Sequence, residues 1–439
     1  MDFRNLSSIA APNWHQKARS FLLFPLGLIL LFGLLNLLTA CTLPQVSAED
    51  RLYLDLSLQF VDASPLPQPF LDETAPGHFS ALTYDRQQNQ FYALAKGFRD
   101  ARFYPLKLAL QAPDSETAHS ETAHSETAAL NTTTIGPIQV GEATVLTQGN
   151  DNPPEGNFEA AGIALSPQQS VFALGEWVDS EGIVPTIDEF DLKTGKQRQR
   201  LPLPNRYLPN LPDRDGSDRD RSDRDGADRD LPNTSAAAPP QGVQDNRGLT
   251  ALTLSPGGAL PAAAEPFRLF AATAAPLEQN RDRTDSRLLH YLLSDGPPLL
   301  IAEHLYPLET DATGAVTSNL VDVVALDQGG HFLSLERADT PLGRSSSRIF
   351  QLAIAGATDI STLPDQTALT GVIPIRKRLL LDLNDPNLPQ GTLTGMTLGQ
   401  RLPDGSQSLW LLSNENVGKA SLKGNRDQPT TQLLLFRLR

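Results

Sequence analysis

Acidic side chains recur at the ends of short apolar segments, where they could bind a divalent cation. In "NFEAAGIALSPQQSVFALGEW" (residues 157–177), Glu159 precedes the first apolar run and Glu176 follows the second. Asp322 and Glu415 hold matching places in later segments. Calcium prefers carboxylate and other oxygen ligands. These four acids therefore predict a calcium site. Acids at strand ends are also common as solvated loop residues, so both interpretations stay open at this point.

Arginine and amide side chains stand beside these acids and could hold the anionic part of a substrate. Asn246 and Arg247 open a third segment, and Arg337 follows Glu336 in a fourth. A guanidinium binds phosphate or carboxylate through paired hydrogen bonds. A divalent ion can polarise a phosphoryl or ester oxygen and activate a water. The set predicts hydrolysis of a small anionic ester or phosphoester by Glu159, Glu336 and Arg337. Asn246 and Arg247 would then bind the substrate.

Other chemistries have little support in the sequence. The chain contains no G-x-S-x-G, no G-x-x-x-x-G-K-[ST] and no H-E-x-x-H motif, which are signatures of hydrolases, nucleotide-binding proteins and metalloproteases. It has 51 acidic and 36 basic residues, and a formal net charge of −15. That charge argues against nucleic acid as a partner and mildly favours bound cations.

Repeated β-strand units must position these residues. Each unit has a short apolar strand, a turn containing Gly, Pro or Asp, and a second apolar strand, and two more strand-like runs usually follow. The first two strands of the five units fall within residues 78–97, 157–177, 246–278, 319–338 and 392–416. Four antiparallel strands per unit are typical of a propeller blade. The sequence thus predicts an all-β protein, a β-propeller with five visible repeat units. Two β-sandwiches are the alternative, but they lack such a repeat.

The two ends of the repeat region complement each other. After the fifth unit only "TQLLLFRLR" (residues 431–439) remains, which supplies a third strand but no fourth. The segment "RLYLDLSLQFVDA" (residues 51–63) precedes the first unit and reads as a strand. Joining the first and last strands in one blade would close the ring and remove exposed sheet edges. We therefore predict that the N-terminal strand closes the last blade.

The N-terminal 41 residues have the pattern of an export signal. Basic residues precede an uncharged apolar stretch, residues 21–40, that ends at Cys41. "LTAC" (residues 38–41) resembles a bacterial lipobox, in which the cysteine carries lipid. We predict a signal peptide over 1–40, a lipidated Cys41, a tether over 41–50 and a propeller over 51–439. An uncleaved transmembrane helix and cleavage after "VSA" (residues 46–48) are the alternatives. All three possibilities place the propeller outside the cytoplasm. Lipidation of Cys41 would make the protein a membrane-anchored lipoprotein of the cell envelope.

Two low-complexity stretches interrupt the repeat pattern. "SETAHSETAHSETAA" (residues 115–129) and "DRDGSDRDRSDRDGADRD" (residues 213–230) contain almost nothing to bury. We predict disordered insertions over 112–130 and 211–240. The alternating aspartates of the second could present oxygens to calcium, but an arginine follows most of them and largely cancels the charge.

Several motifs, in the same order along the chain, resemble one known family. They are "ARFYPLKLAL", "PTIDEFDL", "NRGLTALTLSP", "FLSLER" and "GMTLGQRLPDGSQSLWLLSNEN". They are similar to the exported phytase-like domain described as "esterase-like activity of phytase". The resemblance covers residues 52–439. It implies a phytase-like propeller, usually six-bladed, that hydrolyses phosphoesters or carboxylic esters.

The resemblance also implies that some acids of the family are replaced in this chain. The family often has glutamate where this chain has Thr250 and Thr394, and acids where it has Lys96, Gly97 and Ala274. Fewer carboxylates would weaken a divalent-cation site, because affinity depends on ligand number and charge. Two functions follow as hypotheses. One is a membrane-anchored, calcium-dependent hydrolase, and the other is a non-catalytic propeller that binds a ligand or a protein in the cell envelope.

Overall fold

The computed structural model describes residues 50–67, 78–96, 101–111, 133–148, 157–179, 182–210, 240–255, 265–339, 345–363, 369–414 and 431–439. The chain divides into two compact units, residues 1–52 and 53–439. In the first, only the short 3-10 helix η1 (Asp50–Leu52) is described. The predicted signal peptide, Cys41 and the two low-complexity stretches lie outside the described residues. No described helix is long and apolar enough to cross a membrane.

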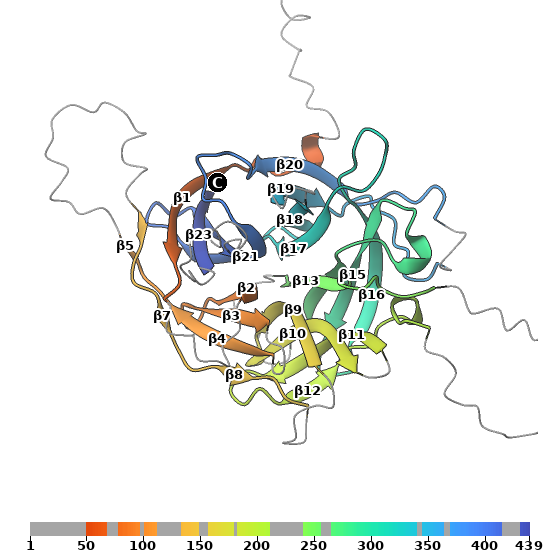
Figure 1. Cartoon of the computed structure of the whole chain (residues 1–439), viewed down its shortest axis with the longest axis horizontal. Coiled ribbons are helices and arrows are strands. Elements are labelled where there is room, and N and C mark those ends of the chain that lie inside the picture. Colours follow the sequence, from red (N-terminus) through yellow and green to blue (C-terminus); the bar gives the residue numbers. More distant parts are fainter. Residues whose placement is uncertain are drawn as a thin grey trace, which may run out of the picture. The chain divides into compact units, whose positions relative to one another are not determined.

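The unit 53–439 consists of antiparallel sheets that surround a central axis as propeller blades (Figure 1). Blade 1 contains β2 (His78–Asp85), β3 (Gln90–Lys96), β4 (Arg102–Lys107), β7 (Gln139–Val140) and β8 (Thr144–Val145). Blade 2 contains β9 (Asn157–Ser166), β10 (Ser170–Asp179), β11 (Gly182–Asp191) and β12 (Gln197–Arg200). Blade 3 contains β13 (Leu249–Leu254), β14 (Phe267–Thr273), β15 (Asp285–Leu293) and β16 (Leu299–Pro307).

Two more blades complete the ring. Blade 4 contains β17 (Asn319–Ala325), β18 (His331–Asp339), β19 (Ser345–Ala353) and β20 (Arg376–Asp382). Blade 5 contains β21 (Thr392–Arg401), β22 (Gln407–Asn414), β23 (Thr431–Leu438) and β1 (Leu58–Pro65). Connections between strands include β5 (Leu110–Gln111), β6 (Thr134–Ile135), and the 3-10 helices η3 (Asn205–Tyr207) and η4 (Glu278–Asn280). The five predicted repeat units are thus confirmed as five blades. Within the described ranges there is no sixth blade, so that expectation from the family resemblance is wrong there.

The N-terminal strand closes the ring, as the sequence predicts. β1 pairs antiparallel with β23, with Leu58 opposite Leu438 and Pro65 opposite Gln432. Two backbone hydrogen bonds between Ser57 and Arg439 extend the pairing. Figure 1 shows β1 beside β23 at the outside of blade 5. The edge of β23 is therefore covered by a segment from the other end of the chain, which keeps it from pairing with another molecule.

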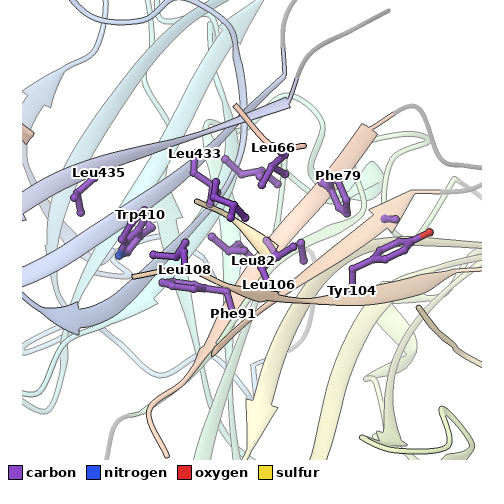
Figure 2. Close-up of a cluster of buried hydrophobic side chains, with 14 of the residues drawn as sticks. Leu66, Phe79, Leu82, Phe91, Tyr104, Leu106, Leu108, Trp410, Leu433 and Leu435 are labelled. Carbon is purple, nitrogen blue, oxygen red and sulfur yellow. The ribbon is translucent and has the colours of Figure 1, made fainter. Parts of the chain in front are cut away.

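The hydrophobic core lies between neighbouring blades. A blade packs against two others, so its middle strands are buried on both faces and lose the alternation of a half-exposed sheet. In β10, for example, four consecutive residues from Val171 to Leu174 are fully buried. Between blades 1 and 5, Phe91 meets Trp410 edge to face with ring centroids 5.2 Å apart, and Leu82 and Leu433 belong to the same cluster (Figure 2).

The five inner strands share a β-bulge near their first residues. The bulged residues, each skipped in the pairing with the second strand of the blade, are Ser80, Ala161, Thr250, Val321 and Thr394. Neighbouring inner strands run in the same direction around the axis, since Ser80 and Thr83 of β2 contact Ala160 and Leu165 of β9 in that order. All five inner strands therefore begin at one mouth of the central channel and end at the other. We call these the first mouth and the second mouth.

Candidate functional site

Two of the predicted metal ligands face each other in blade 2. Glu159 on β9 lies directly opposite Glu176 on β10, and both side chains are half-buried and engaged with other groups. The Glu176 carboxylate occupies the space where a side chain at position 248 would begin, so any other residue there would displace the Glu176 side chain. Gly248 directly precedes β13, so Glu176 reaches the start of blade 3. The structure thereby brings these acids to the junction that carries the predicted substrate-binding residues.

Asn246 and Arg247 lie at that junction on an exposed turn. The Arg247 N–H donates to the carbonyl of Gln244 at 3.0 Å, and Asn246 has a positive φ of 58°. Asparagine adopts this left-handed conformation more readily than most residues. The turn therefore places the exposed Arg247 at the first mouth, directly before Gly248, which the Glu176 carboxylate approaches. This is the part of the predicted site that the fold assembles.

Glu336, predicted to be catalytic, lies inside blade 4 and is only 2% exposed. Its carboxylate accepts hydrogen bonds from the Tyr306 hydroxyl at 2.7 Å and the Glu309 N–H at 3.1 Å. It also accepts from the Ser318 hydroxyl and pairs with the Lys377 ammonium, each at 2.5 Å. Four donors therefore share the two oxygens. A buried charge is tolerated only when it is paired and hydrogen-bonded in this way, so the carboxylate stabilises the blade.

The Lys377 ammonium is itself surrounded by groups that favour its charge. It lies 3.1 Å from a Glu309 oxygen and 4.4 Å from the centroid of the Phe350 ring. The Tyr306 ring is 5.5 Å away. Burial, together with the negative charge of Glu336, raises the pKa of Tyr306 well above its usual range, so the hydroxyl keeps its proton as a donor. These contacts make one closed network around Glu336.

Asp322, predicted to be a metal ligand, is also buried, at the centre of the ring. Its carboxylate accepts the N–H groups of Val323 and of Met396 on β21, both at 2.8 Å. The Leu252 N–H of β13 adds a third hydrogen bond. Removal from water raises the pKa of Asp322 to about 8 despite these donors. The side chain thus joins inner strands of blades 3, 4 and 5.

Arg337 lies half-buried between blades 4 and 5. Its guanidinium donates to the Leu393 carbonyl at 3.0 Å and has a further interaction. Glu415 and Cys41 lie outside the described residues. The predicted residues therefore divide into a group at the junction of blades 2 and 3 and a group in blade 4, in which Asp322 and Glu336 are buried. In the part of the chain that the structure describes, no three His, Cys, Asp or Glu side chains are grouped to hold a metal ion.

Thr250 and Thr394, the two threonines at bulge positions, bind neighbouring blades together. The Thr250 hydroxyl donates to the Val321 carbonyl of β17 at 3.1 Å, and the Thr394 hydroxyl donates to the Phe79 carbonyl of β2 at 3.0 Å. Ser80 makes the equivalent bond to the Ala160 carbonyl at 3.2 Å. Each inner strand is an edge strand of its own sheet. The short hydroxyl side chain at the bulge thus donates a hydrogen bond to a backbone carbonyl of the next inner strand.

Sequence reasoning missed a cavity of about 520 Å³ at the second mouth. The ends of all five inner strands and the turns that follow β2 and β9 line it. The signal in the sequence was a threonine three residues after the bulge in three blades, namely Thr83, Thr253 and Thr397. The acids of the predicted site lie near the opposite ends of the strands, so this cavity is a separate feature.

Comparison with known proteins gives one family match. The model of the family "Phytase-like: Esterase-like activity of phytase" matches residues 74–417. No curated protein matches the chain. Among solved structures, the catalytic domain of the Coprinopsis cinerea GH62 alpha-L-arabinofuranosidase is 10% identical, with 87% of this chain and 97% of that chain covered and a TM-score of 0.38. The endo-arabinase from Bacteroides thetaiotaomicron is 10% identical, with 85% and 96% covered and a TM-score of 0.36. Because the family match spans more than half of the chain, the protein belongs to the phytase-like family described as esterase-like activity of phytase.

Proposed function

We propose that this chain is a ligand-binding member of the phytase-like family. The observation that carries the proposal is the state of Glu336, whose carboxylate is 2% exposed and accepts from four donors, Lys377 among them. A general base or a metal ligand needs a carboxylate that can reach the substrate or the ion. The Glu336 carboxylate instead stabilises the fold, because removing it would leave the Lys377 ammonium without this partner in the blade.

The threonines at the bulges support the same proposal. Thr250 and Thr394 donate their hydroxyls to carbonyls of neighbouring blades. These positions contribute to the cohesion of the ring, and a hydroxyl brings no negative charge to a cation. Asp322 adds another bond between inner strands, in which its carboxylate accepts the Met396 N–H. A fold does not by itself imply an activity, so a family member can retain the propeller fold while the residues of its site differ.

Calcium-dependent ester hydrolysis is the second candidate, and one observation favours it. Glu159 and Glu176 lie directly opposite each other, with the exposed Arg247 beside the glycine that Glu176 contacts. Like charges in opposite positions on neighbouring strands repel each other. A cation at this junction would offset the repulsion, and the guanidinium could bind the substrate anion. In this candidate Glu336 has no catalytic role.

Calcium and ester assays on the full chain separate the two candidates. Binding of calcium to the folded state alone would raise the unfolding temperature, and nitrophenyl phosphate and nitrophenyl acetate would report hydrolysis. We expect no calcium-dependent stabilisation and no turnover. The hydrolase would be the better assignment if calcium stabilised the protein and turnover occurred, and if both were lost in Glu159→Gln. The exposed control Glu142→Gln should keep both.

The location of the protein is a second part of the proposal. We propose that the chain is exported and held at a membrane by lipid on Cys41, on the basis of the apolar stretch before "LTAC". Stable anchoring requires more than one acyl chain. Replacing Cys41 by Ser should leave an unprocessed precursor and abolish labelling with a radioactive fatty acid. Unchanged labelling would show that the anchor lies elsewhere.

A further inference from the structure

The cavity at the second mouth is formed by the convergence of all five blades. Its walls include Leu82, Ile163, Leu252, Val324 and Met396, one from each inner strand. Its volume of about 520 Å³ falls in the range of sites for small organic molecules, roughly 300–1,000 Å³. Because each of the five strands is hydrogen-bonded within its own sheet, the cavity is largely formed before any ligand binds.

Hydroxyl groups are set into these apolar walls at equivalent positions. The Thr83 hydroxyl accepts the Leu165 N–H at 3.2 Å, and the Thr253 hydroxyl accepts the Ala325 N–H at 3.1 Å. Both threonines line the cavity and are less than 10% exposed. Since each oxygen serves as the acceptor, its own proton remains available for donation. The walls can therefore donate to an acceptor oxygen on a bound molecule.

Charged groups at the cavity are engaged with the protein itself. The Asp85 carboxylate is buried and accepts the N–H groups of Gln87 and Gln88 at 2.8 and 3.1 Å. At the rim, the Arg86 guanidinium lies 3.9 Å from the Asp327 carboxylate. A charged group placed between the apolar walls, away from Asp85 and Arg86, would lose its hydration without gaining an opposite charge, which is unfavourable. The lining thus selects for an uncharged molecule.

We infer that the second mouth is the binding site for an uncharged, mainly apolar molecule that carries an acceptor oxygen. Leu82, Ile163 and Leu252 contact its apolar part, and Thr83 and Thr253 donate to its oxygen. The inference rests on the proposed binding function and gives that function a site and a class of ligand. It concerns the mouth opposite the junction of Glu159, Glu176 and Arg247.

The probe for this site is prodan, an uncharged naphthalene dye with one ketone oxygen. Titration into the full chain should give a saturable blue shift of its emission. Leu398→Arg places a charge in the cavity wall and should weaken binding at least tenfold, an effect of about the size that unpaired buried charge produces. The matched control is Leu379→Arg on β20, because Leu379 is 51% exposed and lies away from the cavity. Equal dissociation constants for the two variants, or no saturable shift with the wild type, would overturn the site.

A second pair of variants tests the class of ligand. Thr253→Val removes the donor and keeps the shape, and we expect prodan affinity to fall roughly three- to tenfold, as for one hydrogen bond. Thr253→Ser keeps the hydroxyl and should retain the wild-type affinity. Unfolding temperatures verify that each variant is folded. Equal prodan affinities of Thr253→Val and Thr253→Ser would refute the inference that the ligand carries an acceptor oxygen bound by Thr253. Calcium-dependent ester hydrolysis with normal prodan binding would refute the proposed function and leave this site in place.

Discussion

Asp322→Asn offers a quantitative test of the buried centre of the ring. The Asp322 carboxyl is 6% exposed, accepts backbone N–H groups of Val323 and Met396, and has its pKa raised by burial to about 8. The folded state therefore keeps the proton over a range in which the unfolded chain has released it. This contribution to stability is fully present below about pH 4 and is lost as the pH rises from about 4 to about 8.

The size of the effect follows from that interval. One pH unit corresponds to about 1.4 kcal/mol, so the interval from the ordinary value of 3.8 to about 8 gives an upper limit of roughly 6 kcal/mol. A domain of this kind has a total free energy of unfolding of about 5–15 kcal/mol. The wild type should therefore lose a large part of its stability between pH 5 and pH 8 through this one group. Asp322→Asn has no titrating group at the site and should lack that part of the slope.

Urea unfolding of the full chain at several pH values between pH 5 and pH 8 measures the difference. Other titrating groups contribute equally to both proteins, so subtracting the two curves isolates Asp322. Added calcium supplies a further comparison, since a cation bound to the carboxylate would lower its pKa and stabilise the wild type at high pH. The reasoning is refuted if both proteins show the same pH slope, and the metal-ligand prediction for Asp322 gains support if calcium stabilises only the wild type.

Three other changes test the contacts that hold the blades. Glu336→Gln should lower the free energy of unfolding by about 3 kcal/mol, because it breaks the buried pair with Lys377; a loss below about 1 kcal/mol in urea unfolding would contradict that role. Thr394→Val should cost about 1 kcal/mol through the lost bond to the Phe79 carbonyl, with Thr394→Ser as the matched control that keeps it. Deleting β1, residues 58–65, should uncover the β23 edge and cause aggregation in light scattering, and a soluble monomer of full thermal stability would contradict ring closure.

The blade pattern could be predicted from local features of the sequence. Each unit repeats two apolar runs around a turn, and this spacing produces a hairpin wherever it occurs. The pairing of β1 with β23 followed from counting strands, since the fifth unit lacked one. The hairpin spacing is local and the strand count only adds up the segments, so predicting the blades and the ring closure required no knowledge of side-chain packing.

The division of the acids into structural and accessible groups could not be predicted in the same way. Side chains alternate along a strand, and the extra residue of a bulge changes which face the following side chains occupy. The bulge at Val321 sits directly before Asp322, in a strand whose spacing alone does not reveal it. Strand-end spacing therefore predicted one shared site for Asp322, Glu336 and Glu159, whereas the first two are buried.

The sequence by itself determined the repeat units and the closure of the ring, whereas the structure decided between five blades and six. Only the tertiary structure decided that Thr394 bonds to Phe79 across 315 residues, and that Thr83 and Thr253 line one cavity. The physical reason is that strand formation depends on neighbours along the chain. Burial, hydrogen-bond partners and cavity walls depend on residues that meet only when the blades pack around a common axis.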